Sequence, residues 1–337
     1  MTAYSLLDLV PIVEGSDAAS ALANAADLAR QAEASGYSRY WVAEHHGMSG
    51  IASAATSVVI GHIASRTSTI RVGAGGIMLP NHSPLVIAEQ FGTLDALYPG
   101  RIDLGLGRAP GSDQRVSRAL RRTLESDPQA FPRDVMELQS YFADDGQTGI
   151  SATPGAGAKI PLWILGSSLF GAQLAAALGL PYAFASHFAP AAMDQAIAIY
   201  RRDFRPSAQL DKPHVMLGFN VVVADSDAEA EYLASSQQQS FVAIRTGRPI
   251  QMPPPVEGYR QKLGAQGNAL LDQVLECSAI GSPETVERGL AAFLERTQAD
   301  ELMLTGGVYD AQKRKRSFAL AADAMRSLSK AEPVAAE

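Results

Sequence analysis

Short runs of apolar residues recur along the chain, and most of them end in glycine or in polar residues. Nearly every position within these runs is apolar, which is typical of β-strands that are covered on both faces. They predict strands over residues 4–9, 39–45, 70–76, 101–107, 161–166, 182–187, 215–224 and 301–305. Segments with apolar positions at helical spacing alternate with them, among them residues 16–35, 52–65 and 84–97.

This alternation of strands and helices predicts an α/β fold, a (β/α)₈ TIM barrel, in a single domain over residues 1–330. A doubly wound open sheet is the alternative. The connection between the seventh and eighth strands is long, and residues 246–270 are rich in glycine and proline. Loops of this length are usually functional or disordered, so we predict a lid over the barrel mouth, with a plain insertion as the alternative. Residues 331–337 are expected to form a frayed tail.

Composition narrows the possible partners of the chain. A formal charge of −7 and an isoelectric point of about 5.4 argue against a nucleic-acid partner. The basic run at residues 313–316 predicts a solvated helix face.

One cysteine rules out an intrachain disulfide and indicates a reducing compartment. No apolar run approaches the roughly 20 residues of a membrane helix, and the N-terminus resembles no targeting segment, so we expect no membrane association and a cytoplasmic protein.

Polar and small residues gather where the predicted strands end. In a TIM barrel these strand ends face one common site. The residues concerned are Asp8, Glu44, His45, His46, Gly75, Gly76, Arg108, Ser167, Ser168 and His187. Arg108 is followed by a glycine-rich turn, and a guanidinium beside free backbone amides suits a phosphate. Ser167 and Ser168 stand at the start of a helix and predict a second part of the same anion site. The alternatives are a plain helix cap for the serines and a surface arginine for Arg108.

Several familiar sites are absent from the sequence. The stretch that begins at Gly105 resembles a dinucleotide fingerprint, but Pro110 occupies its third glycine position. No Gly-x-Ser-x-Gly elbow is present. The histidines lack zincin spacing, and a strand would point Glu44 and His46 away from His45, so no metal site is predicted, although different strands could still assemble one.

Four stretches, residues 41–46, 72–84, 100–108 and 164–181, together resemble the bacterial luciferase-like flavin monooxygenases. The resemblance covers nearly the whole chain in the same order. It is strongest to uncharacterised luciferase-like oxidoreductases that carry the Ala-Glu-His-His and Gly-Arg-Ala-Pro-Gly-Ser-Asp sequences found here. This family implies a (β/α)₈ barrel that binds reduced FMN at its carboxyl-terminal mouth, while some members use the deazaflavin F420.

The resemblance also implies roles for individual residues. Arg108, Ser167 and Ser168 match positions that bind the flavin phosphate. Gly75 and Gly76 match a non-prolyl cis peptide beneath the isoalloxazine ring. Glu44 matches a position whose backbone meets the ring, and His45 matches a histidine near the reactive ring edge, the best general-base candidate.

Two features of the family pattern are changed or undecided in this chain. Gly107 stands where true luciferases have a cysteine, so neither light emission nor aldehyde oxidation is predicted. A second phosphate-binding arginine could be Arg118 or Arg121.

These observations together predict a flavin-dependent oxidoreductase, a monooxygenase that uses reduced FMN and O₂ on a small organic substrate. Because no nicotinamide fingerprint is present, we expect a separate flavin reductase to supply reduced FMN, and we expect a homo-oligomer. Two alternatives stay open: an F420-dependent dehydrogenase and a non-catalytic flavin-binding protein.

Overall fold

The computed structural model describes residues 2–108, 116, 119–120, 130–143, 146 and 149–331. Eight parallel strands close into a barrel in the order β1-β2-β3-β4-β5-β6-β7-β9. Their bounds are β1 Ala3–Asp8, β2 Arg39–Val42, β3 Arg71–Met78, β4 Ile102–Gly107, β5 Leu162–Gly166, β6 Tyr182–Phe184, β7 Val215–Val223 and β9 Glu301–Thr305. The predicted (β/α)₈ barrel is therefore confirmed.

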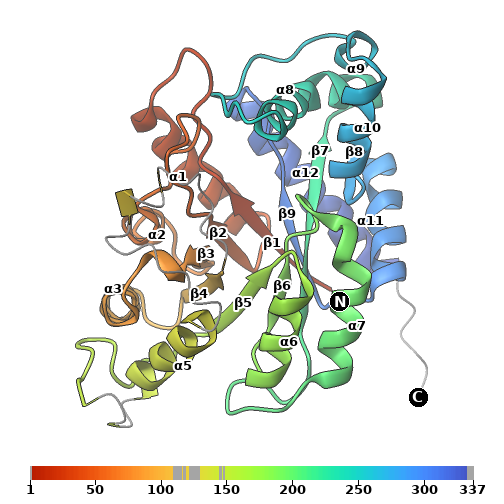
Figure 1. Cartoon of the computed structure of the whole chain (residues 1–337). Helices are drawn as coiled ribbons and strands as arrows, with labels where there is room; N and C mark the ends of the chain where they lie inside the picture. The colour runs from red at the N-terminus through yellow and green to blue at the C-terminus, as the bar shows by residue number, and fades with distance from the viewer. Residues whose placement is uncertain are drawn as a thin grey trace.

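Helices surround the barrel, and neighbours in the chain pack side by side around it (Figure 1). They are α1 Ala18–Ala34, α2 Thr56–Ala64, α3 Pro84–Leu97, α5 Ala130–Ala143, α6 Leu169–Leu178, α7 Met193–Asp203, α8 Asp227–Arg245, α11 Pro283–Thr297 and α12 Ala311–Ala331. Two short 3₁₀ turns are also present: η1 (Leu79–Asn81) follows β3, and η2 (Pro190–Ala192) precedes α7. Among the described helices, none is both long and apolar enough to cross a membrane.

The connection between β7 and β9 is more ordered than the sequence suggests. It contains α8, α9 (Tyr259–Lys262), α10 (Ala265–Val274), the extra strand β8 (Ser278–Gly281) and α11. Strand β8 lies outside the closed ring and pairs with the last residues of β7. Figure 1 places α9 and α10 beside α8. The expectation of one long loop over residues 246–270 was thus wrong for its second half, because dense glycines and prolines hide the short apolar face of α10.

Two strands end earlier than predicted. Strand β2 ends at Val42, so Glu44, His45 and His46 lie in the loop that follows it. Strand β6 ends at Phe184, which places His187 in the loop before η2. The polar residues at these positions therefore belong to loops, where side chains need not alternate between two faces.

Apolar side chains fill the inside of the barrel below its mouth. Trp41 of β2 and Trp163 of β5 pack edge to face, with ring centroids 5.2 Å apart. Leu7, Met216 and Met303 complete this cluster from β1, β7 and β9. A larger apolar layer lies between the barrel and its helices. The inner cluster closes the barrel and forms the bottom of the cavity described next.

Candidate functional site

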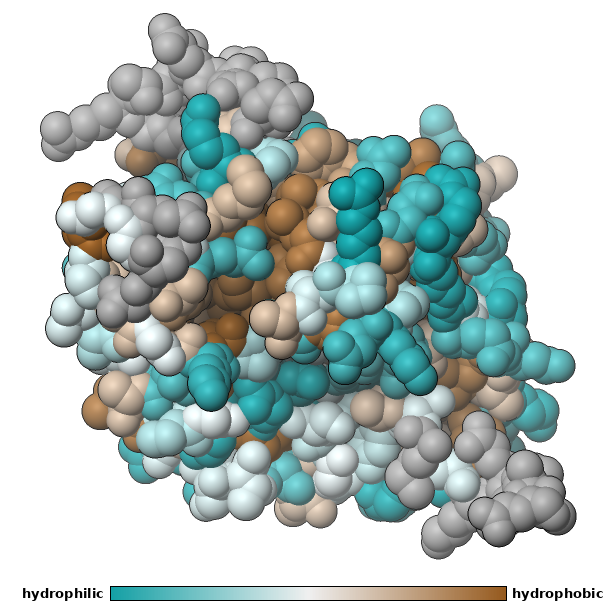
Figure 2. Space-filling view, turned by 90° about the horizontal axis from the view of Figure 1, so that it is seen from below, coloured by the Kyte–Doolittle hydropathy of each residue, from teal (hydrophilic) through white to brown (hydrophobic). Residues whose placement is uncertain are grey.

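A cavity of about 660 Å³ opens at the carboxyl ends of the strands. This volume lies in the usual range of small-molecule sites. Of the ten residues predicted at the strand ends, eight line it: Glu44, His45, Gly75, Gly76, Arg108, Ser167, Ser168 and His187, whereas Asp8 and His46 do not. Among the described residues that line the cavity, Glu44 carries a carboxylate and Arg108 carries a guanidinium. Most of the wall is apolar. One face of the molecule shows such an apolar hollow, in brown, framed by hydrophilic side chains (Figure 2).

One end of the cavity gathers a guanidinium, two hydroxyls and the start of a helix. Arg108 follows β4, is exposed, and holds its guanidinium 4.2 Å from the centroid of the Phe170 ring. Within the described part of the chain, no carboxylate pairs with Arg108. Ser168 is the N-cap residue of α6, yet its side chain makes no capping hydrogen bond. A phosphate could therefore bind here to the guanidinium, to the hydroxyls of Ser167 and Ser168 and to the first backbone amides of α6.

A flat glycine surface forms another wall of the cavity. The peptide bond between Gly75 and Gly76 is cis, as predicted. The pairing of β3 with β4 also shifts register between Ala74 and Ile77. A Cβ on Gly75 would lie 2.9 Å from Leu7 Cδ1, and one on Gly76 would lie 2.7 Å from the Gly105 carbonyl oxygen. Gly76 has no room for a side chain and one at Gly75 would have to displace Leu7, so the two glycines leave bare backbone against the cavity.

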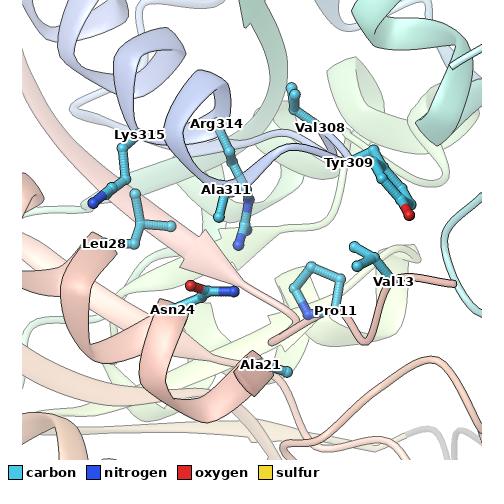
Figure 3. A pocket seen from close by; sticks show the side chains of 10 residues that line it. All are labelled: Pro11, Val13, Ala21, Asn24, Leu28, Val308, Tyr309, Ala311, Arg314 and Lys315. Atoms are coloured by element: carbon cyan, nitrogen blue, oxygen red, sulfur yellow. The ribbon is translucent and has the colours of Figure 1, made fainter. Parts of the chain in front are cut away.

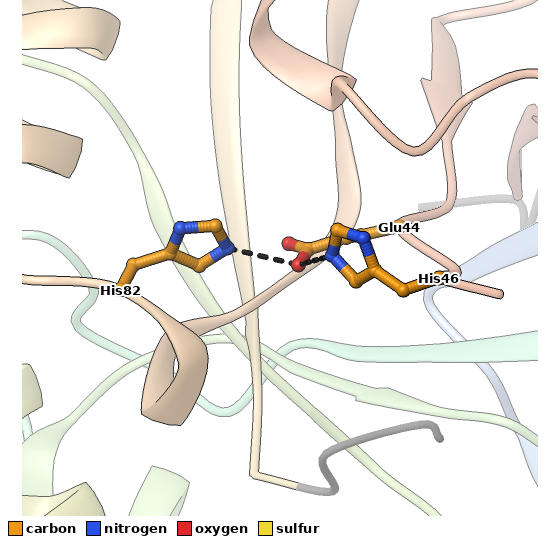
Figure 4. Close-up of side chains that lie close together, drawn as sticks. All are labelled: Glu44, His46 and His82. Carbon is orange, nitrogen blue, oxygen red and sulfur yellow. Dashed lines mark hydrogen bonds and ion pairs between the residues drawn. The ribbon is translucent and has the colours of Figure 1, made fainter. Parts of the chain in front are cut away.

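The Glu44 carboxylate joins the loops after β2 and β3 (Figure 4). Its Oε1 accepts hydrogen bonds from His46 Nε2 at 2.6 Å and from His82 Nε2 at 2.8 Å. Its Oε2 accepts one from the Met78 amide at 2.9 Å. Burial alone would raise the pKa of Glu44, but these hydrogen bonds outweigh it and hold the pKa below its ordinary value. The carboxylate is therefore ionised and fixes the position of both loops.

Glu44, His45 and His46 were expected to lie on a strand, but β2 has already ended and they lie in the loop after it. Glu44 and His46 contact each other, as residues two apart on a strand also can. The metal-binding atoms of Glu44, His46 and His82 lie within 4.8 Å of one another, and no other such group was found among the described residues. Hydrogen bonds already occupy the carboxylate, so the trio is explained without an ion.

His45 lies on the cavity side of the same loop, whereas His46 is not part of the cavity wall. Burial lowers the pKa of His45, and the charge of Glu44 opposes this only in part. The imidazole is therefore neutral near pH 7 and can accept a proton. This placement is what a general base beside a bound cofactor requires.

Asp8 does not face the site, contrary to expectation. Its carboxylate accepts hydrogen bonds from Arg314 Nη2 at 2.7 Å and from the Tyr40 hydroxyl, and all three residues are buried. Arg314 reaches it past a hollow of about 20 Å³ between α1 and α12, which has room for about one water molecule (Figure 3). The basic run at residues 313–316 is therefore not wholly solvated, because Arg314 points inward from α12.

One wall of the cavity was not predicted from the sequence. Gln237, Phe241 and Ile244 of α8 line it, together with Asn220 of β7 and Thr305 of β9. The spacing of Gln237, Phe241 and Ile244, four and three residues, places them on one helix face and is the signal that could have identified them. The two candidates for a second phosphate arginine, Arg118 and Arg121, lie outside the described residues.

The fold and the cavity define a (β/α)₈ barrel protein with a small-molecule site at its carboxyl-terminal mouth. Residues 5–301 match the family model of the luciferase-like monooxygenases, and the chain belongs to this family. It is 55% identical over 327 residues to a luciferase-like monooxygenase of Escherichia coli (strain K12), covering 97% of this chain and 98% of that protein. It is also 33% identical to an N-acetyl-S-alkylcysteine monooxygenase of Bacillus subtilis (strain 168), covering 92% of this chain and 90% of the relative.

Solved structures agree with this assignment. The crystal structure of apo-MsnO8 has a TM-score of 0.87 and 34% identity, over 97% of this chain and 99% of the other. Two more distant structures share the fold: the oxygenating constituent of 3,6-diketocamphane monooxygenase in complex with FMN, with a TM-score of 0.70, and an F420-dependent secondary alcohol dehydrogenase, with a TM-score of 0.66. At 18% and 16% identity they support the barrel architecture and nothing finer.

Proposed function

We propose that this protein is a flavin-dependent monooxygenase that uses reduced FMN and O₂ to oxygenate a small organic substrate. The observation that carries the proposal is the pairing of two features in one cavity. Arg108 is a cation without a carboxylate partner among the described residues, and Gly75 and Gly76 supply a flat surface on which a planar ring can lie. A phosphate attached to a flat ring system matches both features.

The chain's own residues would hold FMN in the following way. Arg108, Ser167 and Ser168 bind the phosphate, since they offer a guanidinium, two hydroxyls and the amides that begin α6. The ring lies against Gly75 and Gly76. Reduced FMN, when bound, supplies the electrons that activate O₂.

His45 and the apolar wall would serve the chemistry. His45 lies at the cavity and stays neutral near pH 7, so it can take up a proton at the edge of the ring. Leu7, Trp41, Met216 and Met303 exclude water from the bottom of the cavity. The loop held by Glu44 keeps His45 in place relative to the glycine surface, because Glu44 ties the β2 loop to Met78 of β3.

The segment 246–270 would act as the lid of this site. Its irregular first half reaches the β1 loop: the Glu14 amide donates to the Met252 carbonyl oxygen at 2.9 Å, and the Met252 amide donates to the Ile12 carbonyl oxygen at 3.1 Å. Val13 and Met252 also form an isolated bridge. The segment therefore spans from α8, which lines the cavity, to the loop after β1, the second strand along the ring from β7. A separate reductase as the source of reduced FMN, and a homo-oligomeric state, belong to the same proposal.

The test is an anaerobic titration with reduced FMN and with reduced F420, followed by a pulse of O₂. We expect reduced FMN to bind, and its reoxidation after the pulse to be slower than that of free reduced FMN at the same concentration. Binding of F420 alone, with no effect on FMN, would support the F420-dependent dehydrogenase instead. Binding of FMN with unchanged reoxidation kinetics, and no oxygenated product from any compound tried, would leave a flavin-binding protein.

A further inference from the structure

The wall of the cavity that faces the glycine surface carries a second imidazole. In the eight-strand ring, β7 lies opposite β3, with three strands between them on either side, and β6 lies opposite β2 in the same way. His187 follows β6 and lines the cavity, so it faces His45 across the barrel mouth. A ligand that lies on Gly75 and Gly76 has His187 and β7 on its other side.

The loop that carries His187 is fixed to β7 at two points. The Ser186 hydroxyl donates to the Gly218 carbonyl oxygen at 2.7 Å, and Asn220 Nδ2 donates to the His187 carbonyl oxygen at 2.7 Å. Gln237 Nε2 of α8 in turn donates to Asn220 Oδ1 at 2.9 Å. These bonds give the imidazole a defined place before any ligand arrives.

Gly218 makes room for the ring. A Cβ at this position would overlap His187 Nδ1 and its neighbouring ring atoms. The imidazole therefore packs directly on the backbone of β7, in space that any other residue type would fill. Gly218 also lines the cavity, so the ring stands between this strand and the ligand space.

The imidazole has an unused hydrogen-bonding atom. His187 Nδ1 is buried and has no hydrogen-bond partner among the described residues. Nδ1 lies against the Gly218 backbone, where a Cβ would come within 2.0 Å of it, so a ligand in the cavity meets the ring at Nε2, which also has no hydrogen-bond partner among the described residues. Burial, and to a lesser degree the nearby His45, lowers the pKa of His187 to about 4, so the ring is neutral at neutral pH. A neutral imidazole offers one donor and one acceptor.

We propose that His187 is the residue that binds the polar group of the substrate, and that this group is a single uncharged one, such as a hydroxyl or carbonyl, on an otherwise apolar molecule. The inference rests on the proposed function, since it takes the flavin to occupy the opposite wall. The remaining lining supports the class of substrate. Phe188, Phe241 and Ile244 around His187 are apolar, and the cation of the cavity, Arg108, lies at the phosphate end.

The experiment compares three probes of similar shape: benzyl alcohol, toluene and benzoate. Binding is followed by tryptophan fluorescence, because the chain has two tryptophans and Trp41 lines the cavity. We expect His187→Leu to weaken benzyl alcohol binding about three- to tenfold, the effect of one lost hydrogen bond, and to change toluene binding less than about twofold. Gly218→Ala should weaken benzyl alcohol similarly by displacing the ring. His62→Leu, the same exchange on α2 outside the cavity, should change neither.

Three results would overturn the inference. Benzyl alcohol binding that is unchanged in His187→Leu would show that the imidazole binds no polar group. A loss for benzoate as large as that for benzyl alcohol would contradict an uncharged substrate. A His187→Leu variant with a melting temperature well below that of the wild type would assign the residue a structural role, because replacing an unpartnered nitrogen by an apolar side chain should not destabilise the fold.

Titration of the same variants with reduced FMN separates the two proposals. FMN binding without His187-dependent alcohol binding defeats only the substrate inference. Alcohol binding that depends on His187, in a protein that binds no flavin, defeats only the flavin proposal.

Discussion

The two ends of the barrel differ in how their charged and polar groups are paired. At the amino-terminal end, Asp103 accepts hydrogen bonds from Arg39 at 2.7 Å and from Arg71 at 2.8 Å, and Arg39 Nε also donates to Glu301 at 3.0 Å. Trp41 Nε1 donates to the same Asp103 carboxylate at 3.2 Å. Every charge in this group has a partner within the chain. This is the pattern expected of residues that hold a barrel closed.

At the carboxyl-terminal mouth, polar groups are left without protein partners. Within the described residues, Arg108 has no carboxylate beside it and His187 Nδ1 has no hydrogen-bond partner. Two carboxylates at this end are exceptions: Asp8 pairs with Arg314 outside the cavity, and the three donors of Glu44 fix loops rather than bind a ligand. Paired charges at one end and unpaired groups at the other separate the part of the barrel that supplies stability from the part that can bind a ligand.

The largest expected effect is a loss of stability caused by a substitution at the amino-terminal end of the barrel. Asp103→Asn removes the charge that pairs with Arg39 and Arg71, and breaking a buried ion pair is strongly destabilising, here by about 3 kcal/mol because the arginines are partly exposed. The free energy of unfolding is measured by urea denaturation. Asp225→Asn is the matched control, since Asp225 pairs with Arg316 at the surface, and it should cost less than about 0.5 kcal/mol. Similar losses for the two variants would mean that the ion network does not hold the barrel.

The next effect is on catalysis. His45→Ala should lower turnover with reduced FMN and O₂ by at least about a hundredfold, once an oxygenated compound is known, while FMN affinity stays within a few-fold. His46→Ala should do less, because His46 contacts Glu44 and does not line the cavity. Equal activity in the two variants would remove His45 from the catalytic role and direct attention to His187 or His82.

These expectations show which parts of the site the sequence could reveal. Arg108, Ser167 and Ser168 were predictable because a strand–helix repeat brings every strand end to one mouth, whatever the details of packing. The bond from Arg314 to Asp8 was not, since it joins residues 306 positions apart in the chain. Likewise, the bond from His82 to Glu44 joins the loops after β2 and β3, and the apolar pattern alone does not locate where those strands end.

The pH dependence of stability should reflect His187. Its pKa is about 4 in the folded protein and about 6.5 when unfolded, so between these values the unfolded chain binds more protons. Stability therefore falls as pH drops from 6.5 toward 4, by about 2 kcal/mol after allowance for partial exposure. Unfolding curves at pH 7 and pH 4.5 measure the loss. His187→Leu should lose less stability than the wild type between these two pH values, because the contribution of His187 is gone. An identical loss in the variant would exclude His187 as the source of the pH dependence.

The smallest effect concerns the lid. Met252→Pro removes the amide that donates to Ile12, whereas Met252→Ala keeps it. One lost backbone hydrogen bond should speed the release of reduced FMN about two- to tenfold in the proline variant, with little change in the alanine control. Stopped-flow dilution measures the release rate. If both variants release FMN at the wild-type rate, the segment does not cover the site.

The central claim is that Arg108, which has no carboxylate partner in the described part of the chain, binds the phosphate of a flavin, and one binding comparison tests it directly. FMN and riboflavin differ only by that phosphate, so both are titrated against the wild type, Arg108→Ala and the exposed control Arg202→Ala. Arg108→Ala should weaken FMN binding by about ten- to a hundredfold, and riboflavin and the control variant should change by less than about threefold. Equal losses of FMN and riboflavin in Arg108→Ala, or no loss of either, would contradict the account.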